Sequence, residues 1–67
     1  MAVDFSRDRQ AQEFAEMFAD HAPDTGSSWR FYWSEGFWFA LQAAGYSECD
    51  ADRIIEEGQR LERERSL

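Results

Sequence analysis

The stretch WRFYWSEGFWFALQAAGY, residues 29–46, holds eight of the eleven aromatic residues in a chain of 67 residues. A chain of this length buries only about 60% of the surface that its unfolded form exposes, so its core is small. Each buried aromatic side chain removes about 150–250 Å² from water. We therefore expect the core to be built around this stretch.

Placed on a helix at about 100° per residue, the stretch divides into an apolar and a polar side. The apolar arc contains Trp29, Trp33, Phe37, Ala40, Leu41 and Ala44, and is extended on one side by Tyr32, Gly36, Phe39 and Ala43. The opposite side contains Arg30, Ser34, Glu35 and Gln42. An apolar stripe this wide predicts a central helix that contacts two neighbours.

A strand is the alternative for the first part of the stretch, because Trp29, Phe31 and Trp33 alternate with other residues at strand spacing. Aromatic residues also favour strands, and the helix would then begin after Ser34. No second segment offers a partner strand, and an unpaired strand leaves its backbone groups without hydrogen bonds. A helix that begins near residue 28 is the preferred interpretation.

Another helix is predicted before this stretch, over residues 7–22. Ser6 or Asp4 is the expected N-cap. Pro23 ends the helix because the residue before a proline avoids helical backbone angles. The inward stripe of this helix consists of Ala11, Phe14, Ala15, Phe18 and Ala22.

A third helix is predicted over residues 48–64. Gly45 provides the left-handed stop of the preceding helix, and Ser47 is the expected N-cap of this one. Gly58 lies in its interior, where glycine costs about 1 kcal/mol relative to alanine. We expect this glycine to permit the close approach of an aromatic ring.

Together these segments predict the all-α class, in the form of a compact three-helix bundle with short connections. The expected organisation is a single small helical domain over residues 1–67, with an N-terminal arm (1–5) and a charged helical tail (59–67). The central helix should span residues 28–44. The side chains expected to be buried are those of Phe14, Phe18, Trp33, Phe37, Leu41, Ile54 and Leu61.

The charge composition is strongly acidic, with fourteen acids against seven arginines, no lysine and a net charge of −7. This balance argues against direct binding to nucleic acid or to an anionic membrane, whose phosphates require cations. It favours a basic protein surface as partner. A single cysteine, no apolar run that could span a bilayer and an N-terminus without a signal-peptide core predict a cytoplasmic protein.

Two motifs are better explained as structure than as function. Asp24-Thr25-Gly26 resembles the active-site turn of aspartic proteases, but that site depends on β-rich lobes, and here the segment lies between two predicted helices. The second and third helices have the outline of a DNA-binding helix-turn-helix. The third helix would present a row of acids to phosphates, so packing is the better explanation.

No catalytic, cofactor or metal site is predicted, and we do not expect an enzyme. Cys49 lies among acidic residues, and the only histidine, His21, is a whole helix away in the sequence. Asp50 and its acidic neighbours complement the positive end of a helix dipole and lack the twelve-residue loop of a calcium site.

The first candidate partner-binding group is a row of acids on the outside of the first helix. Glu13, Glu16 and Asp20 are spaced by three and four residues, and Asp24 follows just beyond. Neighbours in such a row lie about 5–6 Å apart at Cβ, and their charges can spread to a spacing like that of successive phosphates. Between Gln10 and Ser28 there is no arginine to neutralise them. The alternative is an ordinary solvated face.

The second candidate group lies on the polar side of the central helix, where Phe31 and Trp38 accompany Glu35. Two large rings on a polar face need an explanation. Either the N-terminal arm covers them through Val3 and Phe5, or they anchor a partner as a hot spot within a polar rim.

In size, acidity and lack of motifs, the chain resembles the small phage-encoded anti-CRISPR proteins, several of which mimic DNA. The resemblance concerns composition only and assigns no residue roles. It implies a non-catalytic inhibitor that presents an acidic surface to a basic, nucleic-acid-binding protein, such as a CRISPR effector, in the cytoplasm of a bacterial host. The alternative is a small adaptor or regulatory subunit that docks through exposed aromatic side chains, including docking as a homodimer.

Overall fold

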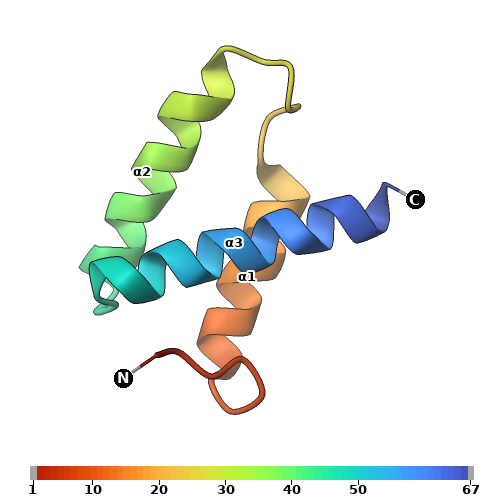
Figure 1. The fold of residues 1–67 in the computed structure, drawn as a ribbon. Coiled ribbons are helices and arrows are strands. Elements are labelled where there is room, and N and C mark those ends of the chain that lie inside the picture. The colour runs from red at the N-terminus through yellow and green to blue at the C-terminus, as the bar shows by residue number, and fades with distance from the viewer. Residues whose placement is uncertain (1, 67) are drawn as a thin grey trace.

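The computed structural model describes residues 2–66, which form three helices and no strand. They are α1 (Arg9–His21), α2 (Trp29–Ala43) and α3 (Glu48–Arg65). In Figure 1, α3 passes across α1, while α2 lies to one side and meets the beginning of α3 through a short turn. The prediction of an all-α three-helix bundle is confirmed, with helix ends within two residues of those expected.

The N-terminus of α1 is capped by a residue that we had expected inside the helix. The Asp8 carboxylate accepts a hydrogen bond from the backbone N–H of Ala11 at 3.0 Å. Asp4, one of the two predicted caps, instead accepts hydrogen bonds from the backbone and hydroxyl of Ser6. The chain therefore makes a separate turn before α1, and the helix begins two residues later than predicted.

The junction between α2 and α3 follows the prediction. Gly45 has a φ of 109°, in the left-handed region that favours glycine. The Ser47 hydroxyl caps α3 by accepting a hydrogen bond from the backbone N–H of Asp50 at 3.1 Å. The Asp50 carboxylate accepts from the backbone N–H of Val3 at 2.9 Å, so it ties the N-terminal arm to the beginning of α3.

The centre of the core lies between α1 and α3, which corrects the prediction that α2 is the central helix. Alanines from both helices meet there, and their small side chains let the two backbones approach closely. The aromatic residues of α2 are too large for such an approach, so this helix packs against the pair from one side. The residues with at most 1% of their surface exposed are Ala11, Ala15, Phe18, Leu41, Ala51 and Ile54.

Phe18 connects all three helices. A Cβ atom placed on Gly58 would lie 2.7 Å from Phe18, so this glycine gives the ring its space, as predicted. On its other side, Phe18 meets the rings of Trp33 and Phe37, at centroid distances of 5.4 and 5.5 Å. We had expected Trp33, Phe37, Phe14 and Leu61 to be buried, but the structure buries them only in part.

The rotation of α2 about its axis also differs from the prediction. Trp33, Phe37 and Leu41 face the core, but Trp29 and Tyr32, which we had placed on the same apolar arc, are 63% and 67% exposed. The orientation of Arg30 accounts for this difference. Its side chain turns inward and donates hydrogen bonds to Glu62 of α3, so that only part of the apolar arc of α2 is covered.

Candidate functional site

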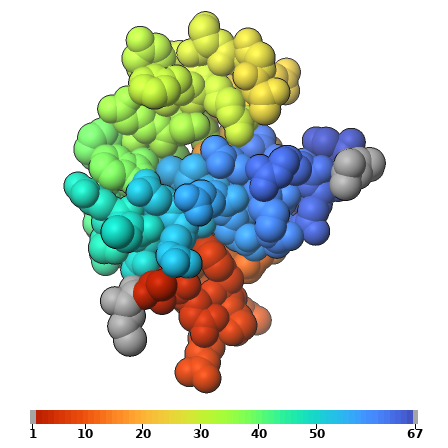
Figure 2. All heavy atoms as spheres, in the orientation of Figure 1, coloured from red at the N-terminus to blue at the C-terminus, as the bar shows by residue number. Residues whose placement is uncertain are grey.

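The most distinctive surface of the molecule is the outward side of α2, which we call the outer surface of α2. All of its residues are exposed, and it consists of Trp29, Phe31, Tyr32, Gly36, Phe39, Ala40 and Ala43. Its four large rings are 58–70% exposed. In Figure 2 the side chains of α2, in green, form one edge of the molecule, beside α3 in blue. Within residues 2–66, no other element covers this side.

The extent of this surface is large for so small a protein. An aromatic side chain has about 150–250 Å² of surface. Four such side chains that are 58–70% exposed together present about 500 Å² to solvent. The whole molecule exposes 4791 Å². The largest apolar patch on a typical soluble monomer is about 300–600 Å² and is often functional. The outer surface of α2 therefore has the size of a binding surface.

Charge is almost absent from this surface. Glu35 lies one helical turn from both Phe31 and Phe39, and it is the one charged residue of α2 that faces solvent, since Arg30 is turned inward. The rings of Phe31 and Tyr32 stack edge to face, with centroids 5.6 Å apart.

The structure separates Phe31 and Trp38, which the sequence had placed together. Phe31 is 70% exposed and belongs to the outer surface of α2. Trp38 packs against the buried core, and its indole N–H is buried without a hydrogen-bond partner among residues 2–66. The two residues lie seven apart on α2, and only the C-terminal one reaches the part of the helix that packs closely.

The predicted acidic row is exposed but is less isolated than we expected. Glu13, Glu16, Asp20 and Asp24 all lie at the surface. Asp20, however, forms an ion pair with Arg65, which the fold brings from the other end of the chain. The expectation that the row has no basic neighbour was therefore wrong, because α3 supplies one.

The N-terminal end of the same row has basic residues nearby as well. Arg7 and Arg9 line a shallow surface cavity of about 520 Å³ together with Glu13 and Glu16. The acidic field of α1 is therefore partly balanced at both ends. Asp24, in the loop after α1, has no ion pair among the described residues.

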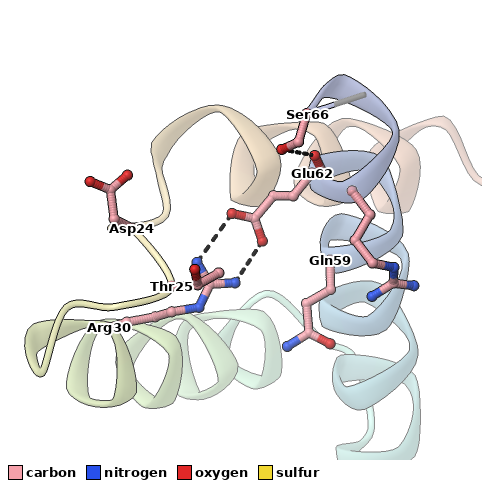
Figure 3. Close-up of a pocket in the computed structure, with 7 residues that line it drawn as sticks. Asp24, Thr25, Arg30, Gln59, Glu62 and Ser66 are labelled. Atoms are coloured by element: carbon pink, nitrogen blue, oxygen red, sulfur yellow. Dashed lines mark hydrogen bonds and ion pairs between the residues drawn. The ribbon is translucent and has the colours of Figure 1, made fainter.

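A larger cavity of about 780 Å³ lies between the α1–α2 loop and the C-terminal half of α3 (Figure 3). The Arg30 guanidinium donates two hydrogen bonds to the Glu62 carboxylate, at 2.6 and 3.1 Å, and one to the carbonyl of Pro23 at 2.6 Å. The hydrogen bond to Glu62 raises the pKa of Arg30. Figure 3 shows the Asp24 carboxylate pointing away from this pair.

Because the Arg30 guanidinium and the Glu62 carboxylate at the centre of this cavity satisfy each other, we interpret their pair as a structural feature. The Arg30 guanidinium also lies 5.5 Å from the centroid of the Phe18 ring. This contact links the ion pair to the core and explains why α2 turns its arginine inward. The sequence pattern did not predict it, since Arg30 and Glu62 are 32 residues apart.

The other motifs found in the sequence gain no chemical role from the fold. Asp24-Thr25-Gly26 lies in the turn between α1 and α2, where the Asp24 carbonyl accepts from the backbone N–H of Ser27. Among residues 2–66, no three His, Cys, Asp or Glu side chains are grouped so that they could hold a metal ion. None of the described helices combines the length and the apolar character needed to cross a bilayer.

Comparison with known proteins adds no further information about the site. Neither a protein-family model, nor a curated protein, nor a solved structure matches this chain.

Proposed function

We propose that the chain is a non-catalytic protein-binding domain that docks through the outer surface of α2. The observation that carries this proposal is the exposure of four large rings, Trp29, Phe31, Tyr32 and Phe39, on one side of one helix. In a small domain with a marginal core, leaving such rings in water forgoes stability that the fold could otherwise gain.

The composition of the surface fits protein recognition better than small-molecule binding. Tryptophan and tyrosine are enriched among interface hot spots, which have a desolvated centre and a polar rim. Here Trp29, Tyr32, Phe39 and the small residues form the centre, and Glu35 lies beside them, between Phe39 and Phe31. A small-molecule site would be concave, whereas this surface is the convex side of a helix.

The test compares capture of binding proteins by the tagged wild-type chain with capture by the double variant Tyr32→Ser/Phe39→Ser. We expect the double variant to keep its helical circular dichroism and to lose the proteins, or the second copy of the chain, that the wild type retains. Met17→Ser is the matched control, since Met17 is an exposed apolar residue of α1, at 46%. Equal capture by all three proteins would refute docking through α2.

A second candidate function is that of an acidic inhibitor of a basic, nucleic-acid-binding protein, with a CRISPR effector in a bacterial cytoplasm as the specific example. The observation in its favour is that Glu13, Glu16 and Asp24 face solvent without an ion pair among the described residues. The ion pair between Asp20 and Arg65 weakens this candidate relative to the first.

Charge reversal at Glu13 and Glu16, together with salt dependence, distinguishes the two candidates. If the acidic face carries binding, Glu13→Arg/Glu16→Arg abolishes it, and affinity falls steeply as ionic strength rises. If the outer surface of α2 carries binding, the reversed variant still binds, and salt has little effect.

A further inference from the structure

We infer that the outer surface of α2 binds a second copy of this chain, through antiparallel packing of the two α2 helices around a two-fold axis beside Gly36. This inference rests on the proposed function, because it names the partner of the same surface. Four observations support it: the position of Gly36, the spacing of large and small residues, the available area and the distribution of charge.

Among residues 2–66, no side chain packs closely enough on Gly36 to require a glycine there. A Cβ atom placed there would meet no other atom within 4 Å, and its φ is not in the left-handed region. Gly58, the other glycine inside a helix, makes room for Phe18, and Gly45 ends α2 with a positive φ. Since glycine weakens a helix interior, Gly36 is explained best by the close approach of something outside the chain.

Large and small residues are placed symmetrically around Gly36. Tyr32 lies four residues before it and Ala40 four residues after it. Trp29 lies seven residues before it and Ala43 seven residues after it. In an antiparallel pair centred on Gly36, Tyr32 and Trp29 of one copy therefore meet the small Ala40 and Ala43 of the other.

This pairing is the property that an interface between identical copies requires. In a two-fold dimer, residue i contacts residue j and residue j contacts residue i, so one surface must complement itself. The N-terminal half of the outer surface is large, with Trp29 and Tyr32, and the C-terminal half includes the small Ala40 and Ala43. Gly36 between them allows the helices to cross closely.

The area is sufficient for a dimer that dissociates at low concentration. Interfaces at the small end of the specific range bury about 600 Å² on each partner, and standard ones about 800 Å². Trp29, Tyr32 and Phe39, the exposed rings on the same side of α2 as Gly36, provide about 400 Å² of this. Gly36, Ala40 and Ala43, which are all exposed, add to this.

Charge favours this orientation of two acidic chains. The molecule carries a net charge of −7, yet the outer surface of α2 has one charge, that of Glu35 between Phe31 and Phe39. Contact through α2 therefore keeps the acids of α1 and α3 out of the interface. Because Glu35 is one residue from the two-fold axis, it lies close to Glu35 of the second copy and opposes association.

The test is sedimentation equilibrium of the full chain over a range of concentrations. We expect the wild type to be a dissociable dimer, and Gly36→Gln, which blocks close approach, to weaken association at least about tenfold. Met17→Gln on α1 is the matched control and should associate like the wild type.

Glu35→Gln should strengthen association by removing the repulsion, whereas it should weaken binding to a basic partner. Circular dichroism confirms that each variant is folded.

The outcomes separate this inference from the proposed function. A wild type that stays monomeric up to about 1 mM, or a dimer that Gly36→Gln leaves unchanged, would overturn the inference. If a monomeric wild type still captures another protein, and Tyr32→Ser/Phe39→Ser loses it, the proposed function stands without the dimer. If neither association nor capture depends on α2, both fail.

Discussion

The inner and outer sides of α2 carry the same kinds of side chain in different surroundings. Trp33 and Phe37 face inward and pack on Phe18, whereas Trp29 and Phe39 face outward and are 63% and 58% exposed. Aromatic content alone therefore does not decide which side of this helix is buried. The difference comes from its neighbours: α1 and α3 leave room for one row of rings, and Arg30 fixes the rotation.

The largest difference in unfolding free energy should appear when a phenylalanine is truncated on each side of α2. Phe37→Ala removes a ring that packs edge to face on both Phe14 and Phe18, so it should lower the free energy of unfolding by about 2–3 kcal/mol. Phe39→Ala, two residues away, should change it by no more than about 0.5 kcal/mol. Chemical denaturation at low protein concentration measures both. Equal losses would mean that the outer side is also packed in the single chain.

The two glycines inside helices should respond in opposite directions. Gly58→Ala places a Cβ atom 2.7 Å from Phe18 and should destabilise the fold by about 1–3 kcal/mol. Gly36→Ala meets no other atom and should stabilise the single chain by up to about 1 kcal/mol, since alanine favours a helix. Thermal unfolding at low protein concentration tests both. A destabilising Gly36→Ala would contradict the description of the outer side as open.

Two further variants each remove one carboxylate charge, from Glu62 of α3, which pairs with the inward Arg30, and from Glu35 on the outward side of α2. Glu62→Gln breaks the paired hydrogen bonds with Arg30, whose side chain is only 15% exposed, and should cost about 1–2 kcal/mol of unfolding free energy. Glu35→Gln changes an exposed residue on the outward side of α2 and should alter the unfolding free energy of the single chain by no more than about 0.5 kcal/mol. Urea titration of the two variants provides the check. If Glu62→Gln had no effect, Arg30 would not be what orients α2.

The smallest effect concerns a pair on α3 that belongs to neither side of α2. The hydrogen bond from Arg60 lowers the pKa of Glu57 below its ordinary value of 4.5. Its contribution to stability is therefore present above about pH 4.5 and is lost as the pH falls through the lower, folded value.

Glu57→Gln should accordingly flatten the acid end of the pH–stability curve by no more than about 0.5 kcal/mol, because the Arg60 side chain is 49% exposed and solvent screens its interaction with Glu57. Unfolding at about pH 6 and about pH 3 measures this difference. An equal loss of unfolding free energy at both pH values would show that Glu57 acts through packing and not through its charge.

Local sequence signals were sufficient to predict the helices and several of their ends. Pro23, Gly45 and Ser47 act through their own backbone or the next few residues, so their roles can be inferred without the fold. The role of Gly58 was also predicted, because a glycine inside an amphipathic helix has few explanations other than close packing.

The rotation of α2 and the basic neighbour of the acidic row could not be predicted in the same way. Both depend on pairs that are distant in the sequence: Arg30 with Glu62, and Asp20 with Arg65. Helical periodicity reports only which residues share a side. Because α2 has large apolar residues on two sides, periodicity did not distinguish its buried side from its exposed one.

The most direct test of self-association through α2 is an isotope-filtered nuclear Overhauser experiment on a mixture of labelled and unlabelled chains. Within one helix, Trp29 and Ala43 are about 21 Å apart, so a cross-peak between the indole of one and the methyl of the other must come from two molecules. We predict cross-peaks from Trp29 to Ala43 and from Tyr32 to Ala40. Intermolecular cross-peaks confined to α1 or α3, or none at a concentration where the chain is dimeric, would contradict this account.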